Sequence, residues 1–143
     1  MKAYIAQFLI IAAVIAACST QNKIPDTTAV AGATANDTVR IANDDLEYEI
    51  MIIDPGFNSW LASRAKPRGH YSQEYLESKN WVWVTEWNSR VLQPQRYRNL
   101  YQMRIDYDQN IDYGYEVNYL LYNYLVYFQL TNGQQLGGVV PQF

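Results

Sequence analysis

Residues 112–132 read DYGYEVNYLLYNYLVYFQLTN and form the densest apolar and aromatic stretch of the chain. Apolar side chains recur in it at intervals of three and four, the spacing of one face of a helix. Asp112 and Glu116 lie at its amino end, where carboxylates favour a helix start, and Asn132-Gly133 supplies a left-handed stop. The stretch therefore predicts one long helix, although tyrosine, valine and phenylalanine also favour strands.

The apolar part of this helix is too broad for a helix that shows one face to water, so we expect protein to cover most of its circumference. A membrane span is disfavoured, because Glu116, Asn118, Asn123 and several phenolic hydroxyls would need hydrogen-bond partners that hydrocarbon does not offer. Tyrosines suit a core in which each ring is buried and each hydroxyl reaches water or a backbone carbonyl. The sequence thus predicts an aromatic core around residues 112–132.

The first 17 residues have the features of a secretory signal. Lys2 gives a short positive start, and an uninterrupted apolar block begins at Phe8. The block ends in IAAC at residues 15–18, which resembles the lipobox of bacterial lipoproteins, with isoleucine in place of the commonest leucine. The resemblance implies that residues 1–17 are removed and that the thiol of Cys18 carries a diacylglycerol. No second cysteine exists to form an intramolecular disulfide.

Residues 18–43 are predicted to be the lipidated cysteine followed by a flexible tether. From Ser19 to Asn43 the chain is rich in Ser, Thr, Ala, Asn and Asp, has no aromatic residue, and shows no apolar period. Such a composition cannot bury enough surface to offset the entropy lost on ordering. Ser19 directly after the cysteine favours the outer membrane in the best-studied sorting system. We therefore expect a lipid-anchored protein of the cell envelope, in the outer membrane and facing the periplasm.

The charge balance limits the partners that we expect. The chain has a formal net charge of -3, and removing Lys2 with the signal makes the remainder more acidic. A surface that is acidic and has no clustered charge is a poor match for nucleic acid or for anionic lipid head groups. The expected contacts are the membrane, through the N-terminal lipid, and an envelope protein.

Residues 44–143 are predicted to fold as one globular domain. Residues 47–54 read EYEIMIID and alternate as a strand, with apolar residues on both faces at its end. This pattern predicts a covered strand instead of a water-facing edge. Asp54 and Pro55 then predict the cap and first position of a helix.

A second helix is predicted to begin at Ser72 and to end before Pro94. The alternative is a strand over residues 80–85, NWVWVT, whose composition favours it. Residues 101–107 predict a second strand, and residues 134–140 a short third one. Because helices connect the first two strands, we expect a parallel pair with a right-handed crossover. The predicted fold class is α+β, with about three helices, a two- or three-stranded sheet and an aromatic core.

A basic loop separates the first two predicted helices. It contains Arg64, Lys66, Arg68 and His70, the single histidine of the chain. The functional interpretation is an anion site, in which the three cations hold a phosphate or carboxylate and His70 moves a proton. The alternative is a solvated linker whose charges keep the domain soluble.

Acidic and amide residues alternate before the long helix, at Asp106, Asp108, Asn110 and Asp112. This is the ligand spacing of a calcium loop. Ile111 stands where the sharp-turn glycine of an EF-hand belongs, however. The alternative is that these side chains cap a strand end and the start of the helix.

Aromatic residues and glutamates suggest two further sites. The tryptophans could line a groove that stacks on sugars, but at helical spacing such residues more often form a core. One of Glu74, Glu77 and Glu86 could be a glycosidase acid, although nothing in the sequence places a second carboxylate at a useful distance. The tryptophans are Trp60, Trp81, Trp83 and Trp87.

Several motifs together resemble a small family of Gram-negative envelope lipoproteins of unknown function. They are IDPGF at residues 53–57, AKPRG at 65–69, YSQEYL at 71–76, EWN at 86–88 and NIDYGYEVNY at 110–119. The resemblance covers most of the domain and supports the lipoprotein assignment. It implies no activity and therefore no catalytic residues.

These observations predict a membrane-anchored envelope lipoprotein that acts as a non-catalytic interaction or structural module. No cofactor is expected. The first alternative is a periplasmic module that binds an anion or a glycan. The second is an envelope hydrolase.

Overall fold

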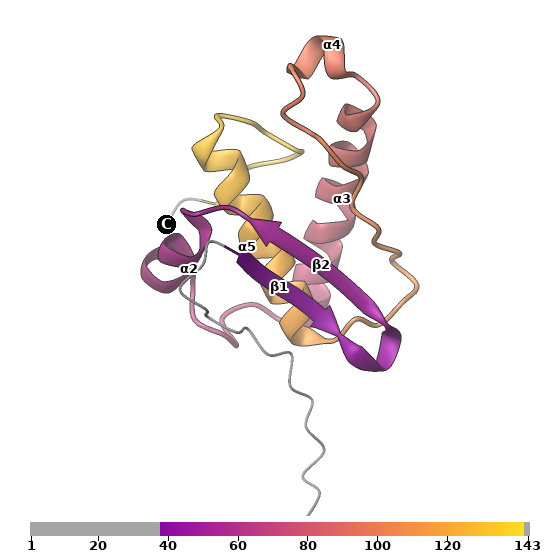
Figure 1. Cartoon of the computed structure of the whole chain (residues 1–143). Coiled ribbons are helices and arrows are strands. Elements are labelled where there is room, and N and C mark those ends of the chain that lie inside the picture. Colours follow the sequence, from indigo (N-terminus) through magenta and orange to yellow (C-terminus); the bar gives the residue numbers. More distant parts are fainter. Residues whose placement is uncertain (1–37, 142–143) are drawn as a thin grey trace, which may run out of the picture.

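The computed structural model describes residues 38–141. A β-hairpin and two helices pack around a long C-terminal helix, and a very short helix lies at one end of the molecule (Figure 1). The elements are β1 (Thr38–Asn43), the 3₁₀ turn η1 (Asp44–Leu46), β2 (Tyr48–Ile53), α2 (Phe57–Arg64), α3 (Gln73–Val91), α4 (Pro94–Tyr97) and α5 (Tyr115–Thr131). The predicted α+β class with an aromatic core is confirmed. The segments 1–17 and 19–37, as well as Cys18, lie outside the described residues.

Helix α5 is the centre of the domain, as its sequence predicts. Twelve of its 17 residues are buried, and α2, α3 and β1 pack against it (Figure 1). Asn132 ends the helix and Gly133 follows with φ of +60°, the predicted left-handed stop. The start differs from the prediction, because Gly114 is the N-cap. Asp112 lies two residues before this N-cap and stabilises the turn that leads into the helix. Its Oδ1 accepts a hydrogen bond from the Gly114 backbone N–H at 2.9 Å.

The sheet is an antiparallel hairpin, not the predicted parallel pair. β1 pairs with β2 from Thr38 opposite Ile53 to Asn43 opposite Tyr48. Residues 38–43 therefore belong to the domain and not to the tether, which corrects the predicted boundary at residue 44. Two apolar side chains on one face, Val39 and Ile41, are buried against the core and give this otherwise polar stretch enough apolar surface to order.

The outer face of the hairpin is open to solvent. Met51 is 62% exposed and Ile53 is 76% exposed, so the prediction that this strand is covered on both faces is wrong. With two strands and helices on one side only, the sheet has no layer to cover these residues (Figure 1). Apolar residues on both faces of this strand therefore do not mean that both faces are buried.

The two other predicted strands, 101–107 and 134–140, are irregular segments. Side chains of α3 take the place of a neighbouring strand for the first of them. Trp87 Nε1 donates to the Met103 carbonyl at 2.8 Å, and the Asn88 amide bonds both the N–H and the carbonyl of Ile105 at 2.8 Å. The backbone is thus hydrogen-bonded without a ladder.

Helix α3 confirms the prediction for residues 72–91, including the stretch that could have been a strand. The Ser72 hydroxyl accepts a hydrogen bond from the Tyr75 N–H at 3.3 Å, and Leu76, Trp83 and Trp87 are buried on one stripe. Helix α2 starts later than predicted, with Gly56 as N-cap.

The core combines stacked aromatic rings with buried amides. Trp83 stacks on Tyr122 with ring centroids 5.3 Å apart. The Asn80 amide donates to the backbone carbonyl and Oδ1 of Asn118, at 3.0 and 3.1 Å, which joins α3 to α5. Asn80 Oδ1 and the Tyr122 hydroxyl have no hydrogen-bond partner among the described residues, and burial raises the pKa of Tyr122. Within residues 38–141, no helix has both the length and the apolar character that crossing a bilayer requires.

Gly56 gives a direct test of the packing between α2 and α5. Its φ of −85° suits any residue, but a Cβ there would lie 2.3 Å from the Tyr127 hydroxyl. We expect Gly56→Ala to lower the free energy of unfolding by about 2 kcal/mol, measured by chemical denaturation. In the background of Tyr127→Phe, which lacks the clashing oxygen, the same substitution should cost at least about 1 kcal/mol less. Equal costs in the two backgrounds would contradict this packing.

The buried tyrosines predict a loss of stability in alkali. Burial, with Asp54 and Tyr127 nearby, raises the pKa of Tyr124 to about 12. In the unfolded chain a tyrosine titrates near pH ~10, so between these values unfolding releases a proton and stability falls as the pH rises. Tyr124→Phe should reduce the slope of unfolding free energy against pH by roughly one proton over this interval. Ionisation of the Tyr124 phenol can be followed by its ultraviolet absorbance. Ionisation at pH ~10 in the folded protein would refute the predicted loss of stability.

Candidate functional site

The predicted basic loop is fastened to the first turns of α5. Arg68 forms a two-pronged ion pair with Glu116, in which Nε donates to Oε2 at 2.7 Å and Nη2 donates to Oε1. The Gly69 N–H donates to the Tyr115 hydroxyl at 2.7 Å, and the Tyr119 hydroxyl donates to the Lys66 carbonyl at 2.8 Å. Each bond ties the connection between α2 and α3 to α5.

Arg68 is therefore engaged within the protein. Its guanidinium also lies 4.6 Å from the centre of the Tyr119 ring, and the hydrogen bond to Glu116 raises its pKa. Arg64 and His70 are exposed, and the His70 ring meets the edge of Tyr71 with centroids 4.6 Å apart. Anion binding at Arg64, Lys66, Arg68 and His70 stays a prediction, with one of its cations already paired.

The alternating acidic residues act in turns. Asp108 Oδ1 accepts hydrogen bonds from the backbone N–H and the side chain of Asn110, both at 2.8 Å. Asp112 Oδ1 also accepts from the Gln73 side chain at 2.7 Å. Across the described part of the chain, no three His, Cys, Asp or Glu side chains are grouped so that they could hold a metal ion. The calcium hypothesis for Asp106, Asp108, Asn110 and Asp112 thus gains no support from the geometry.

The tryptophans are mostly structural. Trp83 and Trp87 are buried, and their Nε1 groups donate to the carbonyls of Gly137 at 3.0 Å and Met103 at 2.8 Å. Trp60 is half-buried beside Phe57 and Tyr127, whereas Trp81 is exposed. The interpretation of these residues as core is confirmed for Trp83 and Trp87.

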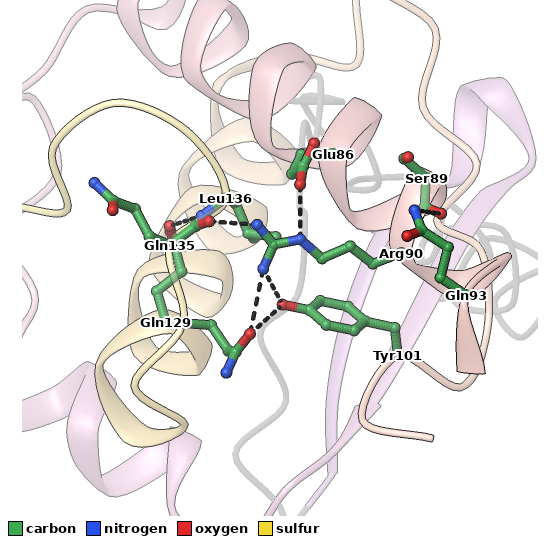
Figure 2. Close-up of polar contacts among 9 residues, drawn as sticks. Glu86, Ser89, Arg90, Gln93, Tyr101, Gln129, Gln135 and Leu136 are labelled. Carbon is green, nitrogen blue, oxygen red and sulfur yellow. Dashed lines mark hydrogen bonds and ion pairs between the residues drawn. The ribbon is translucent and has the colours of Figure 1, made fainter. Parts of the chain in front are cut away.

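Arg90, near the end of α3, forms four side-chain hydrogen bonds and joins two distant segments of the described chain. Its guanidinium donates to Glu86 at 2.8 Å, to the Tyr101 hydroxyl at 2.8 Å, to Gln134 at 3.2 Å and to the Gln135 carbonyl. Figure 2 shows Arg90 reaching between Glu86, on its own helix, and the C-terminal segment that holds Gln135 and Leu136. We call Arg90 and its four partners, Glu86, Tyr101, Gln134 and Gln135, the Arg90 cluster. They fasten the C-terminal segment to α3.

A shallow hollow of about 520 Å³ lies against the Arg90 cluster. Its walls are Glu86, Arg90 and residues 135–139. Burial alone would lower the pKa of Arg90, but the hydrogen bonds that Arg90 donates to Glu86 and Tyr101 outweigh burial and raise the pKa. Among the described lining residues Glu86 is the single carboxylate, and a glycosidase uses two. Neither Arg68 nor His70 lines the hollow. The residues predicted to bind an anion and Glu86, the candidate glycosidase acid, therefore do not share it.

The Arg90 cluster is not predicted from the sequence. One local signal was available, because Glu86 and Arg90 are four residues apart and would meet on a helix. The partners Gln134 and Gln135 lie 44 and 45 residues away. Nothing in the sequence announces their contact with Arg90.

Comparison with known proteins places this fold in a family. The sequence profile described as Family of unknown function (DUF6146) matches residues 6–141. The chain belongs to this family. The unknown-function part of the resemblance seen in the sequence is thereby confirmed, whereas DUF6146 membership says nothing of a lipoprotein. No curated protein and no solved structure matches this DUF6146 chain.

The Arg90 cluster predicts how the C-terminal segment is held. Arg90→Met keeps the length of the side chain but removes its donors, and we expect it to lower the free energy of unfolding by about 2–3 kcal/mol. The Leu136 N–H, which donates to Gln129 Oε1 at 2.7 Å, should then exchange faster with deuterium. The matched control is Arg96→Met, at an exposed position, for which we expect less than about 0.5 kcal/mol. Unchanged exchange at Leu136 in Arg90→Met would contradict the role of the cluster.

Proposed function

We propose that this DUF6146 chain is a lipid-anchored protein of the cell envelope that acts as a non-catalytic interaction module. The observation that carries the proposal is the apolar block that ends in IAAC, with Cys18 as the single cysteine of the chain. Several acyl chains on one residue give firm anchoring, whereas a single chain gives marginal binding.

The arrangement of ionisable groups supports a role without catalysis. The best candidates for chemistry are spread over different parts of the domain: Arg68 pairs with Glu116, and Glu86 pairs with Arg90 beside the hollow. Asp108 and Asp112 shape turns. Most of these groups already serve the fold.

The position of the domain in the chain supports a tethered module. β1 begins at Thr38, 20 positions after Cys18. A chain of that length reaches at most about 70 Å when fully extended. The domain would thus stay within about 70 Å of the membrane that holds the lipid. In this proposal that membrane is the outer membrane, and the domain faces the periplasm.

Fatty-acid labelling tests this proposal. Cells that express the full chain are grown with an alkyne-bearing fatty acid, and the membranes are separated from the soluble fraction. We expect the label on the chain and the chain in the membrane fraction, and expect the label to be lost in Cys18→Ser.

The matched control is Ser19→Ala, which changes the next residue and leaves the thiol. It should keep the label and the membrane location. An unlabelled wild-type chain, or a Cys18→Ser chain that still carries the label, would overturn the proposal.

A further inference from the structure

The basic residues of the chain are unevenly distributed. Residues 87–105 contain four of the 11 lysines and arginines and none of the 14 acidic residues. Arg90 is engaged within its cluster, whereas Arg96, Arg98 and Arg104 are exposed. An acidic protein therefore carries, besides the basic loop at residues 64–70, a second cationic region, whose charges are all guanidinium groups.

This region forms one end of the molecule. We call residues 92–104 the α4 tip: they leave the end of α3, pass through α4 and return alongside α3 (Figure 1). Figure 1 shows α4 at the end of the molecule far from the turn of the hairpin. The tip also exposes two large apolar side chains, since Leu92 is 71% exposed and Met103 is 75% exposed.

The tip is held rigidly at its base. The Arg90 guanidinium lies 5.0 Å from the centre of the Tyr97 ring and 5.5 Å from that of Tyr101. The Met103 carbonyl accepts a hydrogen bond from Trp87, and the Leu100 N–H donates to the Tyr97 carbonyl at 2.9 Å. The exposed arginines thus project from a fixed frame.

The backbone at the tip favours a role for the side chains. Arg98 and Asn99 have φ of +51° and +60°, in the left-handed region where glycine is the cheapest residue. Arginine in this conformation has a higher conformational free energy than glycine would have, and glycine would serve the turn equally well. Its guanidinium is presented to solvent in spite of that cost.

We propose that the α4 tip docks on a membrane surface that carries anionic phospholipids. Guanidinium groups bind phosphate oxygens with paired hydrogen bonds, and charge complementarity draws a cationic tip to an anionic bilayer. Leu92 and Met103 can then enter the apolar boundary of the head-group layer, as exposed apolar residues of interfacial segments do. This combination of exposed arginines and exposed apolar side chains selects the lipid surface.

The size of the tip argues against a protein partner as its occupant. A stable protein–protein interface buries about 800 Å² on each side, contributed by some 20–30 residues. The tip consists of one four-residue helix and its flanking turns. A bilayer needs no such area. The lipid anchor of the proposed function would hold the domain close to the membrane, so that weak docking becomes effective. The in vivo role of the tip therefore rests on the proposed function.

This proposal departs from the sequence-based expectation that anionic head groups are poor partners. That expectation used the net charge of the whole chain, and the net charge averages over charges that the fold separates. The run without acidic residues from 87 to 105 is visible in the sequence. Its exposure together with Leu92 and Met103 is not.

Vesicle sedimentation tests the proposal. Residues 18–143 with Cys18→Ser, which lack both the apolar signal and the lipid, are mixed with vesicles of phosphatidylcholine alone or with added phosphatidylglycerol. We expect added phosphatidylglycerol to increase the bound fraction, and salt to weaken this increase. Arg98→Gln with Arg104→Gln should lower partitioning to the anionic vesicles by about 10- to 30-fold.

The matched control is Arg40→Gln with Lys79→Gln, which removes the same charge from β1 and α3 and should change partitioning less than about twofold. For the apolar contribution, Leu92→Ser with Met103→Ser should also weaken binding. Met51→Thr with Ile53→Thr, on the exposed face of the hairpin, should not. Circular dichroism melts check that each variant is folded.

Four outcomes would overturn the proposal. Equal losses in the tip and control pairs would mean that binding follows net charge. Competition by inorganic phosphate would indicate a site for the free anion, and competition by an equal charge of polyglutamate an acidic polypeptide partner. An unmutated chain whose binding ignores phosphatidylglycerol would exclude docking altogether. Because this chain carries no lipid, none of these outcomes bears on fatty-acid labelling of Cys18.

Discussion

Helix α5 must find hydrogen-bond partners for polar groups that it carries into the core, and the rest of the domain is arranged to supply them. Three of its amide side chains, Asn118, Asn123 and Gln129, are buried. A buried amide without partners costs about 1–3 kcal/mol. Asn123 and Gln129 donate to carbonyls one turn back on their own helix, at 2.7 and 3.0 Å. The side-chain oxygens of Asn118 and Gln129 accept hydrogen bonds from neighbouring segments.

These remaining bonds decide what packs where. Asn118 Oδ1 accepts from Asn80 on α3 and from the Tyr107 hydroxyl at 2.7 Å. Gln129 Oε1 accepts from Leu136, which places the C-terminal segment against α3 and within reach of Arg90. The apolar surface of α5 gives the domain most of its stabilisation, but its amides choose the partners. A wholly apolar α5 would bury as much area and specify less.

Periodicity made the helices predictable, and the sheet was harder because its signal is short. The stripes of α3 and α5 extend over many turns, and their stop signals are local, at Asn132 for example. β1 has six residues, of which only Val39 and Ile41, with the small Ala42, are buried apolar side chains. Residues 101–107 alternate like a strand, yet Trp87 and Asn88 satisfy their backbone groups. An alternating pattern indicates an extended backbone. Which segment forms hydrogen bonds with that backbone depends on the tertiary structure.

The candidate sites show the same division. Composition identified the cations of the loop between α2 and α3, but the pairing of Arg68 with Glu116, 48 residues away, depends on the fold. The Arg90 cluster was likewise beyond local reasoning, apart from its contact with Glu86. The α4 tip lies between these cases, since its charge is visible in the sequence and its exposure is not.

The hairpin has a mechanical consequence. Thr38 and Ile53 lie opposite each other at the open end of β1 and β2, and the turn closes the other end at residues 44–47. A pull on the chain before Thr38 would act against the attachment of Ile53 to α2 and would load the strand pairs one after another. Such a geometry unzips under small force, whereas strands pulled from opposite ends share the load among all their bonds. The hairpin would thus peel open first and act as a yielding joint, leaving the helices around α5 intact under tension.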